Sequence, residues 1–355
     1  MDPVAPFRFA GLPVRVVFGE GTLAEVGAEV ARLGRSRALV LSTVGHAAAA
    51  EDLAATLGDA AAGVFAGAVM HTPLEVTERA VAAYRAADAD CVVAIGGGST
   101  IGLGKAIAVR TGADQVAVPT TYAGSEMTDI LGETTEERKT TRRDPAIRPE
   151  AAIYDVALTL GLPAGLTATS GLNALAHAVE GLYAPDRNPI LTLMAREAVA
   201  ALVAALPALA ANPKDRAARG RALYGAWLCG TVLGGTTMGL HHKLCHVLGG
   251  GFGLPHAETH AVILPHAAAF NAGAVGDLLA PVAAVLAAPP GEGLFALAGR
   301  IGAPRSLREL GLAEADLDRA TALATETPYP NPRPVEPAAL RALLGRAWAG
   351  ERPAA

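Results

Sequence analysis

Residues 91–100 read CVVAIGGGST, and this stretch decides the fold of the first half of the chain. Its apolar part, residues 91–95, has the composition of a buried strand, and a helix-like segment through Lys105 to Arg110 follows the glycines. Glycines let backbone N–H groups approach a phosphate, and the N-terminus of the next helix adds free donors and a positive dipole end. The stretch therefore predicts a phosphate-binding turn, although a tight turn without a ligand also favours glycine.

The glycine stretch differs from the two best-known nucleotide motifs. Ile101 stands where the G-x-G-x-x-G fingerprint has its third glycine, and the Gly-Lys-Ser/Thr of a P-loop is missing. The next expected strand, residues 116–119, runs into a second polar loop, residues 119–126 (PTTYAGSE). Because parallel strands end at the same edge of a sheet, the two loops should lie side by side, which suits a dinucleotide.

Strand-like and helix-like segments alternate around this stretch. We expect strands at residues 14–18, 38–41 and 63–66, and helices at residues 22–33, 47–57 and 74–87. Such alternation gives a mostly parallel sheet covered by helices, with ligands at the carboxyl ends of the strands. We therefore predict a Rossmann-like α/β nucleotide-binding domain over residues 1–160.

Strand signals fade after about residue 160. Alanine and leucine at helical spacing dominate residues 170–211, 216–233 and 276–286. We therefore predict a second, all-helical domain over residues 161–355 that carries the catalytic and substrate-binding groups.

The composition of the chain limits the kinds of partner and compartment that can be expected. It has 355 residues, of which 51% are hydrophobic, and a formal net charge of −5 with scattered basic residues, so no footprint for nucleic acid is visible. The longest apolar stretch, residues 198–211, is too short to span a bilayer, and the N-terminus lacks a secretion signal. Three widely spaced cysteines argue against a disulfide framework. We expect a cytoplasmic protein that acts on a small molecule.

A polar cluster in the helical half has the spacing of a metal site. Asn173 precedes His177 by four residues, and His242 precedes His246 by four, so each pair shares one helix face. Three glycines, residues 249–251, are expected to break the second helix before His256. Three imidazoles and a carboxylate would bind a divalent cation, but the amide of Asn173 brings no charge. The arrangement favours a shared pocket, whereas each histidine alone could be an ordinary core or surface residue.

Motifs along almost the whole chain resemble the iron-type (group III) alcohol dehydrogenase superfamily and, within it, its maleylacetate reductase branch. The motifs are FGEGTLAEVG, GGGST, PTTYAGSEMT, RDPAIRPEAAIYD, SGLNALAHAVEGLY, GLHHKLCHVLGGGFGLPHAETH and PYPNPRPV. Metal-dependent members typically have aspartates where this chain has Gly102 and Asn173. Both departures, with HTPLEVTE and GLGKAIA, resemble the maleylacetate reductase branch, whose members are understood to work without a bound metal. The resemblance thus implies the dehydroquinate synthase-like fold and no metal.

The resemblance also implies NADH or NADPH as cofactor and assigns residues to it. The pyrophosphate would lie on Gly96, Gly97, Gly98, Ser99 and Thr100. The ribose and nicotinamide would lie along Thr120, Thr121 and Ser125, and Lys139 matches a lysine that reaches a cofactor ribose. Ser42 and Thr43 stand where NAD-specific relatives have an aspartate, so the site should repel a 2′-phosphate less.

The implied reaction is reduction of the C=C bond of maleylacetate to 3-oxoadipate, in the breakdown of aromatic compounds. His177, His242 and His256 match metal-ligand positions, and His246 matches a neighbouring pocket histidine. Together these four histidines, the expected catalytic residues, would stabilise the oxyanion formed when hydride adds to the enone, and one would supply the proton.

Lys243 and Asn173 are the expected substrate contacts, with Lys243 as the candidate for a substrate carboxylate and the loop arginines Arg187 and Arg333 as weaker ones. A homodimer is implied by the resemblance alone. Two alternatives stay open: a metal-dependent alcohol or polyol dehydrogenase of the same superfamily, and a nucleotide-binding module without catalysis. Metal content and a substrate assay separate the first from the expected enzyme, and NADH turnover would exclude the second.

Overall fold

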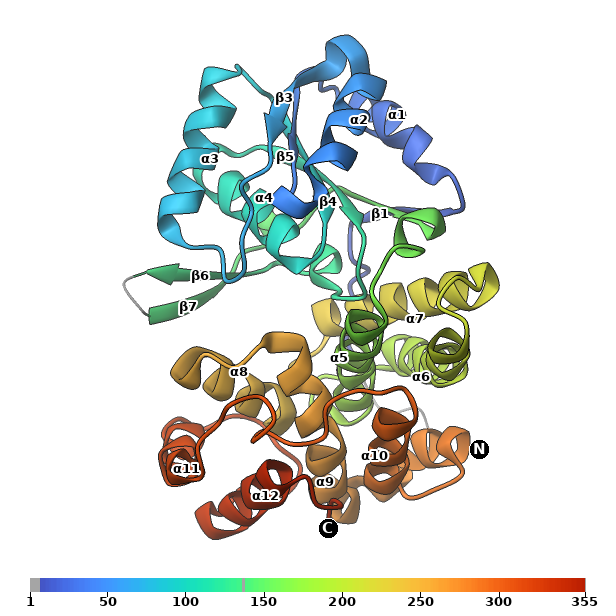
Figure 1. Ribbon diagram of the computed structural model, residues 1–355, viewed down its shortest axis with the longest axis vertical. Coiled ribbons are helices and arrows are strands. Elements are labelled where there is room, and N and C mark those ends of the chain that lie inside the picture. Colours follow the sequence, from blue (N-terminus) through green and yellow to red (C-terminus); the bar gives the residue numbers. More distant parts are fainter. Residues whose placement is uncertain (1–6, 136–137, 355) are drawn as a thin grey trace. The chain divides into compact units, whose positions relative to one another are not determined.

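The computed structural model describes residues 7–135 and 138–354 of the chain (Figure 1). Of the described residues, 12–162 form one compact unit, and residues 7–11 together with residues 163–354 form the other. The α/β unit thus ends near the expected residue 160, but it does not include residues 7–11, which the predicted range of 1–160 had placed in it. The first unit is a parallel α/β structure, and the second is helical. The predicted fold class, a Rossmann-like α/β domain followed by an all-α domain, is confirmed.

A sheet of six parallel strands forms the centre of the α/β unit, in the order β1-β8-β5-β4-β2-β3. The strands are β1 (Arg15–Gly19), β2 (Ala38–Leu41), β3 (Ala61–Phe65), β4 (Cys91–Gly96), β5 (Asp114–Pro119) and β8 (Ala151–Asp155). Every residue of β4 is buried. A parallel strand covered on both faces needs apolar side chains at every position, which accounts for the run at residues 91–95.

Four helices cover the two faces of this sheet (Figure 1). They are α1 (Val26–Arg32), α2 (Ala47–Leu57), α3 (Leu74–Ala86) and α4 (Gly98–Thr111). Val92 and Ala94 of β4 pack into one apolar cluster with residues of α3 and α4. Val93 and Ile95 pack into a second cluster with residues of α1 and α2. This alternation follows from the two-residue period of a strand.

The sequence pattern did not predict the antiparallel pair of β6 (Ile130–Thr135) and β7 (Arg138–Arg143), or the strand β8. The strand β7 reads RKTTRR, so it has none of the apolar alternation that identifies a half-buried strand. The expected helix at residues 22–33 is a 3₁₀ turn, Thr22–Glu25, followed by α1.

The helical unit consists of eight helices among the described residues. They are α5 (Ala164–Tyr183), α6 (Pro189–Ala211), α7 (Arg216–Gly235), α8 (Leu240–Phe252), α9 (His256–Leu286), α10 (Pro290–Arg300), α11 (Leu317–Thr325) and α12 (Pro337–Ala349). The expected helical stretch at residues 170–211 is thus two helices, because Asn188 caps α6 by accepting from the Leu191 N–H and Pro189 follows at the first turn.

One expectation about α8 is wrong. The glycines at residues 249–251 do not break this helix, which continues through them to Phe252. It ends instead at Gly253, whose φ of 69° is the left-handed conformation that glycine adopts without strain. The break before His256 therefore lies at Gly253–Pro255, and α9 starts at His256 directly after it.

Two helical stretches are long and apolar enough to cross a membrane by length and composition alone, Pro189–Ala211 and His256–Arg300. Core helices of soluble proteins pass the same test, and half of the apolar window in the first stretch is buried within the molecule. The second stretch is not one helix, because α9 has a kink at Val275 and ends at Leu286 before α10 begins. These stretches are weak evidence for a membrane protein.

Candidate active site

The glycine stretch forms the turn between β4 and α4. Gly97 is the N-cap of α4 and Gly98 its first residue, so the N-terminal N–H groups of this helix lie at the loop. Gly96 has a φ of 155°, and a Cβ atom there would overlap the side chain of Thr100. A glycine is therefore required at this position by both the backbone conformation and the space available.

The second polar loop lies directly beside the glycine stretch, as predicted. The Thr120 N–H donates to the Gly96 carbonyl at 3.0 Å. A Cβ atom on Gly97 would lie 3.0 Å from the Thr121 side chain, and one on Gly98 would lie 3.6 Å from Ala123. The hydroxyls of Thr100 and Thr120 are buried without a hydrogen-bond partner among the described residues. Paired loops with spare donors at the end of a parallel sheet suit a dinucleotide.

A buried lysine that sequence reasoning did not select fixes this second loop. Lys105 on α4 has no exposed surface, and its Nζ atom donates to the Ser125 carbonyl at 2.6 Å, the Thr128 hydroxyl at 2.8 Å and the Ile130 carbonyl at 3.0 Å. Burial lowers the pKa of Lys105 to about 7. The amine therefore connects the phosphate-loop helix to the segment that carries Ser125.

The remaining expected cofactor residues lie at separate points of the α/β unit. Ser42 directly follows β2 and is buried, with its N–H bonded to the Phe65 carbonyl. Thr43 follows it, and its hydroxyl is 3.1 Å from Nδ1 of His46. Lys139 lies in β7 opposite Thr134, but its side chain is outside the described part of the chain. Ser42 and Thr43 thus share the carboxyl edge of the sheet with the glycine stretch.

In the helical unit, three helices bring the predicted histidines together. His177 comes from α5, His242 and His246 from α8, and His256 from α9. The rings of His177 and His242 stack with centres 5.1 Å apart, and those of His242 and His246 are 6.2 Å apart. The four-residue spacing thus did place these side chains in one cluster.

Two further histidines belong to the cluster and were missed by sequence reasoning. His260 lies on α9, with its ring centre 4.3 Å from that of His256 and 5.1 Å from that of His242. His241 lies 4.8 Å from His260. His260 follows His256 by four residues, so the same helical spacing could have identified it.

Glu180 on α5 also belongs to the histidine cluster and was not identified from the sequence. Its carboxylate positions the start of α8. Its carboxylate accepts from the backbone N–H groups of Gly239 at 3.2 Å and His241 at 2.8 Å, and it lies 2.5 Å from Nδ1 of His242. Burial raises the pKa of Glu180, and the backbone donors with the neighbouring His241 oppose that shift. Because helix N-termini favour negative charge, this carboxylate is well placed as an anion.

Burial favours the neutral form of the four buried imidazoles of the cluster. Burial, reinforced by the neighbouring rings, lowers the pKa values of His177, His242 and His260 well below the ordinary value. It lowers the pKa of His241 to about 4. His246, in contrast, is exposed. The cluster therefore offers lone pairs and N–H groups without net positive charge.

Several buried polar atoms in the cluster have no hydrogen-bond partner among the described residues. They are Asn173 Oδ1, His177 Nδ1, His242 Nε2 and both ring nitrogens of His260. Because Nδ1 of His242 faces the Glu180 carboxylate, its Nε2 atom is the acceptor in the neutral ring. Such atoms could bind a cation or a polar ligand. The four residues that the resemblance aligns with metal-ligand positions are an amide, Asn173, and three imidazoles.

Closely grouped metal-ligating atoms also occur in the sets Glu180, His241, His242 and His241, Cys245, His260. In the first set the carboxylate is already engaged by backbone N–H groups and by His242. In the second, burial raises the pKa of the Cys245 thiol well above its ordinary value. Cys245 packs in the apolar core of the unit, as small filler.

The expected substrate cations differ in their surroundings. Lys243 is half-buried, and its Nζ atom donates to the Thr327 hydroxyl at 2.9 Å. Arg333 donates to the Phe270 carbonyl at 3.0 Å and stacks on the Phe270 ring. Arg187 is exposed in the loop between α5 and α6 and contacts only the carbonyl of Ala184 in the described structure. Of these three residues, Lys243 is the one next to a cluster histidine, His242, and its hydrogen-bond partner Thr327 lines a pocket.

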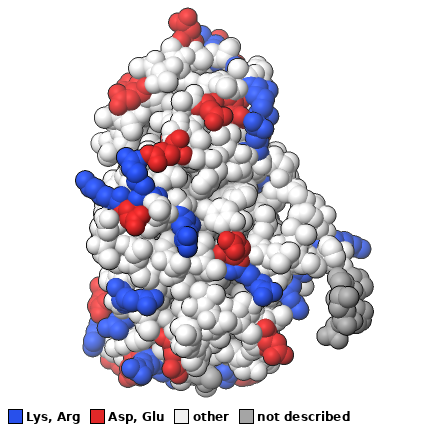
Figure 2. All heavy atoms as spheres, turned by 90° about the vertical axis from the view of Figure 1, so that its right-hand side faces the viewer, with Lys and Arg blue, Asp and Glu red and all other residues white. Residues whose placement is uncertain are grey.

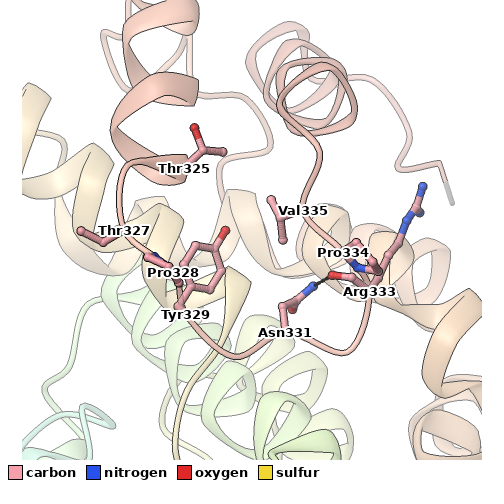
Figure 3. A pocket seen from close by; sticks show the side chains of 8 residues that line it. All are labelled: Thr325, Thr327, Pro328, Tyr329, Asn331, Arg333, Pro334 and Val335. Carbon is pink, nitrogen blue, oxygen red and sulfur yellow. Dashed lines mark hydrogen bonds between the residues drawn. The ribbon is translucent and has the colours of Figure 1, made fainter.

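That pocket has a volume of about 220 Å³ and is formed by the segment between α11 and α12 (Figure 3). Its lining residues are Thr325, Thr327, Pro328, Tyr329, Asn331, Arg333, Pro334 and Val335.

The two halves of the chain match known families. Residues 13–156 match the iron-containing alcohol dehydrogenase family, and residues 167–348 match the C-terminal part of the Fe-containing alcohol dehydrogenase family. The chain therefore belongs to the iron-containing alcohol dehydrogenase family.

Within that family the chain groups with the maleylacetate reductases. It is 60% identical to maleylacetate reductase from Rhizobium sp. (strain MTP-10005), over 98% of this chain and 99% of that one. It is 53% identical to the maleylacetate reductase of Burkholderia cepacia, over 98% and 99% of the two chains. The crystal structure of maleylacetate reductase from Agrobacterium tumefaciens superimposes with a TM-score of 0.96 at 59% identity, covering 98% of this chain and 100% of that one.

Proposed function

We propose that this protein reduces maleylacetate to 3-oxoadipate with NADH or NADPH, in the breakdown of aromatic compounds. The observation that carries the proposal is the cluster of neutral imidazoles beside Asn173, in a chain that groups with the maleylacetate reductases. This cluster offers hydrogen bonds to an oxyanion, and its ligand set lacks the charge that would hold a cation.

The reaction needs one hydride and one proton. The hydride leaves the nicotinamide and forms a C–H bond at the alkene carbon remote from the ketone, and the π electrons move onto the ketone oxygen. The cofactor becomes NAD⁺ or NADP⁺, and a proton added at the carbon next to the ketone completes the product. Preorganised N–H donors stabilise the enolate oxygen in the transition state, and a histidine supplies the proton.

The roles within the histidine cluster follow from burial and hydrogen bonding. His177, His256 and Asn173 are proposed to donate to the developing oxyanion, and His242 does so only once its Nε2 atom carries a proton, because its Nδ1 atom faces Glu180. His246 is proposed as the residue that exchanges protons with solvent, because it is exposed whereas His177 and His242 are buried. Glu180 favours the imidazolium form of His242 once charge develops on the substrate oxygen, because it is the nearest carboxylate.

We also propose that the reaction proceeds without a bound metal. The family is named for iron, so membership in it does not support a metal-free reaction. The proposal rests instead on the individual residues of this chain. Three neutral imidazoles and an amide leave the charge of a divalent cation uncompensated. Conjugation of the alkene to the ketone lessens the need for a Lewis acid.

Cofactor binding is proposed for the two loops of the α/β unit. Backbone N–H groups of Gly97 and Gly98 at the start of α4 would hold the pyrophosphate, and the Thr100 and Thr120 hydroxyls are available to it. Neither Ser42 nor Thr43 brings a carboxylate that would repel the 2′-phosphate of NADPH. We therefore expect both cofactors to support turnover, with a preference below roughly 100-fold.

The wider setting is a cytoplasmic homodimer that acts on a small dicarboxylate. A second copy of the chain is proposed on the resemblance to the maleylacetate reductases alone. On the face that Figure 2 shows, basic and acidic side chains are interspersed.

A metal-dependent alcohol dehydrogenase is the second candidate, supported by the unpartnered lone pairs of Asn173, His177 and His242. The test is oxidation of NADH and NADPH with freshly prepared maleylacetate, measured beside a panel of aldehydes and ketones. We expect turnover of maleylacetate and little with simple carbonyl compounds. Metal-dependent turnover of an alcohol or aldehyde, with maleylacetate inert, would replace the proposal by the second candidate.

A further inference from the structure

The pocket between α11 and α12 is made by a segment whose motif, PYPNPRPV, has no role in the proposed chemistry (Figure 3). This segment passes close to the start of the histidine helix. A Cβ atom on Gly239, the residue before α8, would lie 2.9 Å from the Pro330 carbonyl and 3.3 Å from the Glu180 carboxylate. The pocket is therefore a neighbour of Glu180 and His242 within the same unit.

Two polar side chains fix the segment rather than serve a ligand. Asn331 and Asn271 donate to each other's amide oxygens at 2.8 and 2.9 Å, and Asn331 also donates to the Arg333 carbonyl at 2.7 Å. The guanidinium of Arg333 is held by Phe270 and, in Figure 3, points away from Tyr329 and Thr325. These contacts hold the pocket wall in place before any ligand arrives.

Two groups at the pocket are suited to bind a ligand: the hydroxyl of Tyr329, which lines the pocket, and the ammonium of Lys243, which donates to the lining residue Thr327. The Tyr329 hydroxyl is buried without a hydrogen-bond partner among the described residues, and Figure 3 shows it pointing into the space between Thr325 and Val335. Burial raises the pKa of Tyr329 to about 12, so it stays a donor. The Nζ atom of Lys243 lies 5.7 Å from the centre of the Tyr329 ring.

The ammonium group of Lys243 has capacity for a ligand. It carries three N–H groups, and its one hydrogen bond in the described structure is to Thr327. The ammonium and the buried, unsatisfied hydroxyl are two hydrogen-bond donors that an anionic oxygen could accept from. Hydrogen bonds to a charged acceptor are stronger than those to a neutral one.

We propose that the Lys243 ammonium and the Tyr329 hydroxyl bind one carboxylate of the substrate in the pocket of residues 325–335, next to the His242 end of the histidine cluster. This inference rests on the proposed function, whose substrate has two carboxylates. It adds Tyr329 and the PYPNPRPV segment as determinants of specificity for a diacid over a monoacid.

The test is steady-state kinetics of Lys243→Met and Tyr329→Phe, with Lys214→Met and Tyr224→Phe as matched controls. Lys214 is an exposed lysine of the same unit, and Tyr224 is a half-buried tyrosine on α7. We expect the KM for maleylacetate to rise roughly tenfold or more in Lys243→Met and several-fold in Tyr329→Phe, because a hydrogen bond to a charged group contributes that much binding. The affinity for NADH should be unchanged in all four variants.

A second substrate identifies the interaction as one with a carboxylate. The monoacid cis-4-oxo-2-pentenoate keeps the enone and one carboxylate of maleylacetate. If the missing carboxylate is the one bound, wild type should prefer maleylacetate and Lys243→Met should lose that preference. If the remaining carboxylate is the one bound, the KM of Lys243→Met relative to wild type should rise as much for the monoacid as for maleylacetate. Either result supports the inference.

Unchanged KM values for maleylacetate in both variants, with wild-type turnover intact, would overturn the inference and leave the proposed function standing. So would equal increases in the two controls, which would show a general structural effect. Failure of the wild-type protein to reduce maleylacetate refutes the proposed function instead, and it is seen before any variant is compared. Binding of the product 3-oxoadipate, titrated without turnover, should weaken in Lys243→Met in parallel with KM.

Discussion

Nδ1 of His242 lies 2.5 Å from a carboxylate oxygen of Glu180, and both side chains are buried. The contact joins α5 to the first turn of α8, where the same carboxylate also accepts backbone N–H groups. A carboxylate on one ring nitrogen fixes the tautomer and orientation of an imidazole, so Nε2 of His242 is directed to the ligand. It also stabilises the imidazolium if the ring takes up a proton.

Replacing Glu180 by Gln should therefore lower kcat by roughly 100-fold, because the amide keeps the size of the side chain but removes the charge and can favour the wrong tautomer. NADH affinity should stay near that of the wild type. Stopped-flow reduction under single-turnover conditions, beside fluorescence titration of NADH, measures the two effects separately. Glu197→Gln, an exposed site on α6, is the control. Normal single-turnover rates in Glu180→Gln would remove the carboxylate from the mechanism.

Spacing and burial determine which site residues the sequence could predict. The turn at residues 96–100 was predictable because a run of buried strand residues ends directly in glycines. Asn173 with His177, and His242 with His246, follow the helical period. His260 obeys the same rule relative to His256, and Glu180 follows His177 by three residues, so both could have been found.

Other features depend on contacts between distant segments and had no local signal. Lys105 reads as an ordinary helix residue, and only the packing of β6 and the loop before it surrounds its amine with oxygen acceptors. His241 is adjacent to His242, and neighbouring helix residues point about 100° apart, so adjacency does not predict a shared pocket. The strands β6 and β7 pair through charged and polar sequence that carries no strand pattern.

The close contact of Gly97 with Thr121 gives a prediction about the cofactor. In Gly97→Ala, the new methyl would lie 3.0 Å from Thr121 and stand at the N-terminus of α4, where the pyrophosphate needs backbone N–H groups. The Kd for NADH should rise roughly tenfold or more, with little change in thermal stability. Gly161→Ala is the control, since a Cβ there meets nothing within 4 Å. An unchanged Kd in Gly97→Ala would place the pyrophosphate elsewhere.

Lys105 should make the stability of the protein depend on pH in an unusual direction. Its pKa in the folded state is about 7, against roughly 10.4 for lysine in an unfolded chain. Between these values the unfolded chain binds more protons, so the free energy of unfolding rises with pH across this window. Below about pH 7 both states are protonated and the contribution is constant.

Urea unfolding of wild type and Lys105→Met at several pH values between about 7 and 10 tests this dependence. The stability of the wild type relative to Lys105→Met should increase with pH, by up to about 1.4 kcal/mol per pH unit. The variant also loses hydrogen bonds to Ser125, Thr128 and Ile130, but that loss shifts the difference by a constant amount. A difference that is flat with pH would show that Lys105 stays protonated throughout the window.

The histidine cluster should affect chemistry more than cofactor binding. His246→Ala and His256→Ala should each lower kcat by roughly 100-fold or more, because each removes a donor that acts on the developing oxyanion or delivers the proton. NADH titration should give near-normal Kd values, since the expected cofactor loops lie in the other unit. Near-normal turnover in both cluster variants would move the chemistry to other residues.

Asn173 leads to the last prediction, that the purified protein carries no stoichiometric metal and keeps its activity after exhaustive chelation. With a carboxylate at residue 173, the side chains of His177, His242 and His256 would complete a set of one anion and three imidazoles. The amide instead leaves a divalent cation without a charged ligand in a largely buried cluster, where the nearby Glu180 carboxylate is already engaged by His242 and backbone N–H groups.

Elemental analysis, paired with assays before and after chelation, is the direct measurement. Asn173→Asp is the companion variant, and we expect it to gain zinc or iron affinity because the new anion supplies both charge and a stronger oxygen ligand. Asn212→Asp, in the loop after α6, is the control for the charge change alone. Three histidines can bind zinc in some proteins, so the outcome depends on affinity in this cluster. About one equivalent of metal per wild-type chain, lost and restored together with activity, would refute the metal-free mechanism and favour a metal-dependent dehydrogenase.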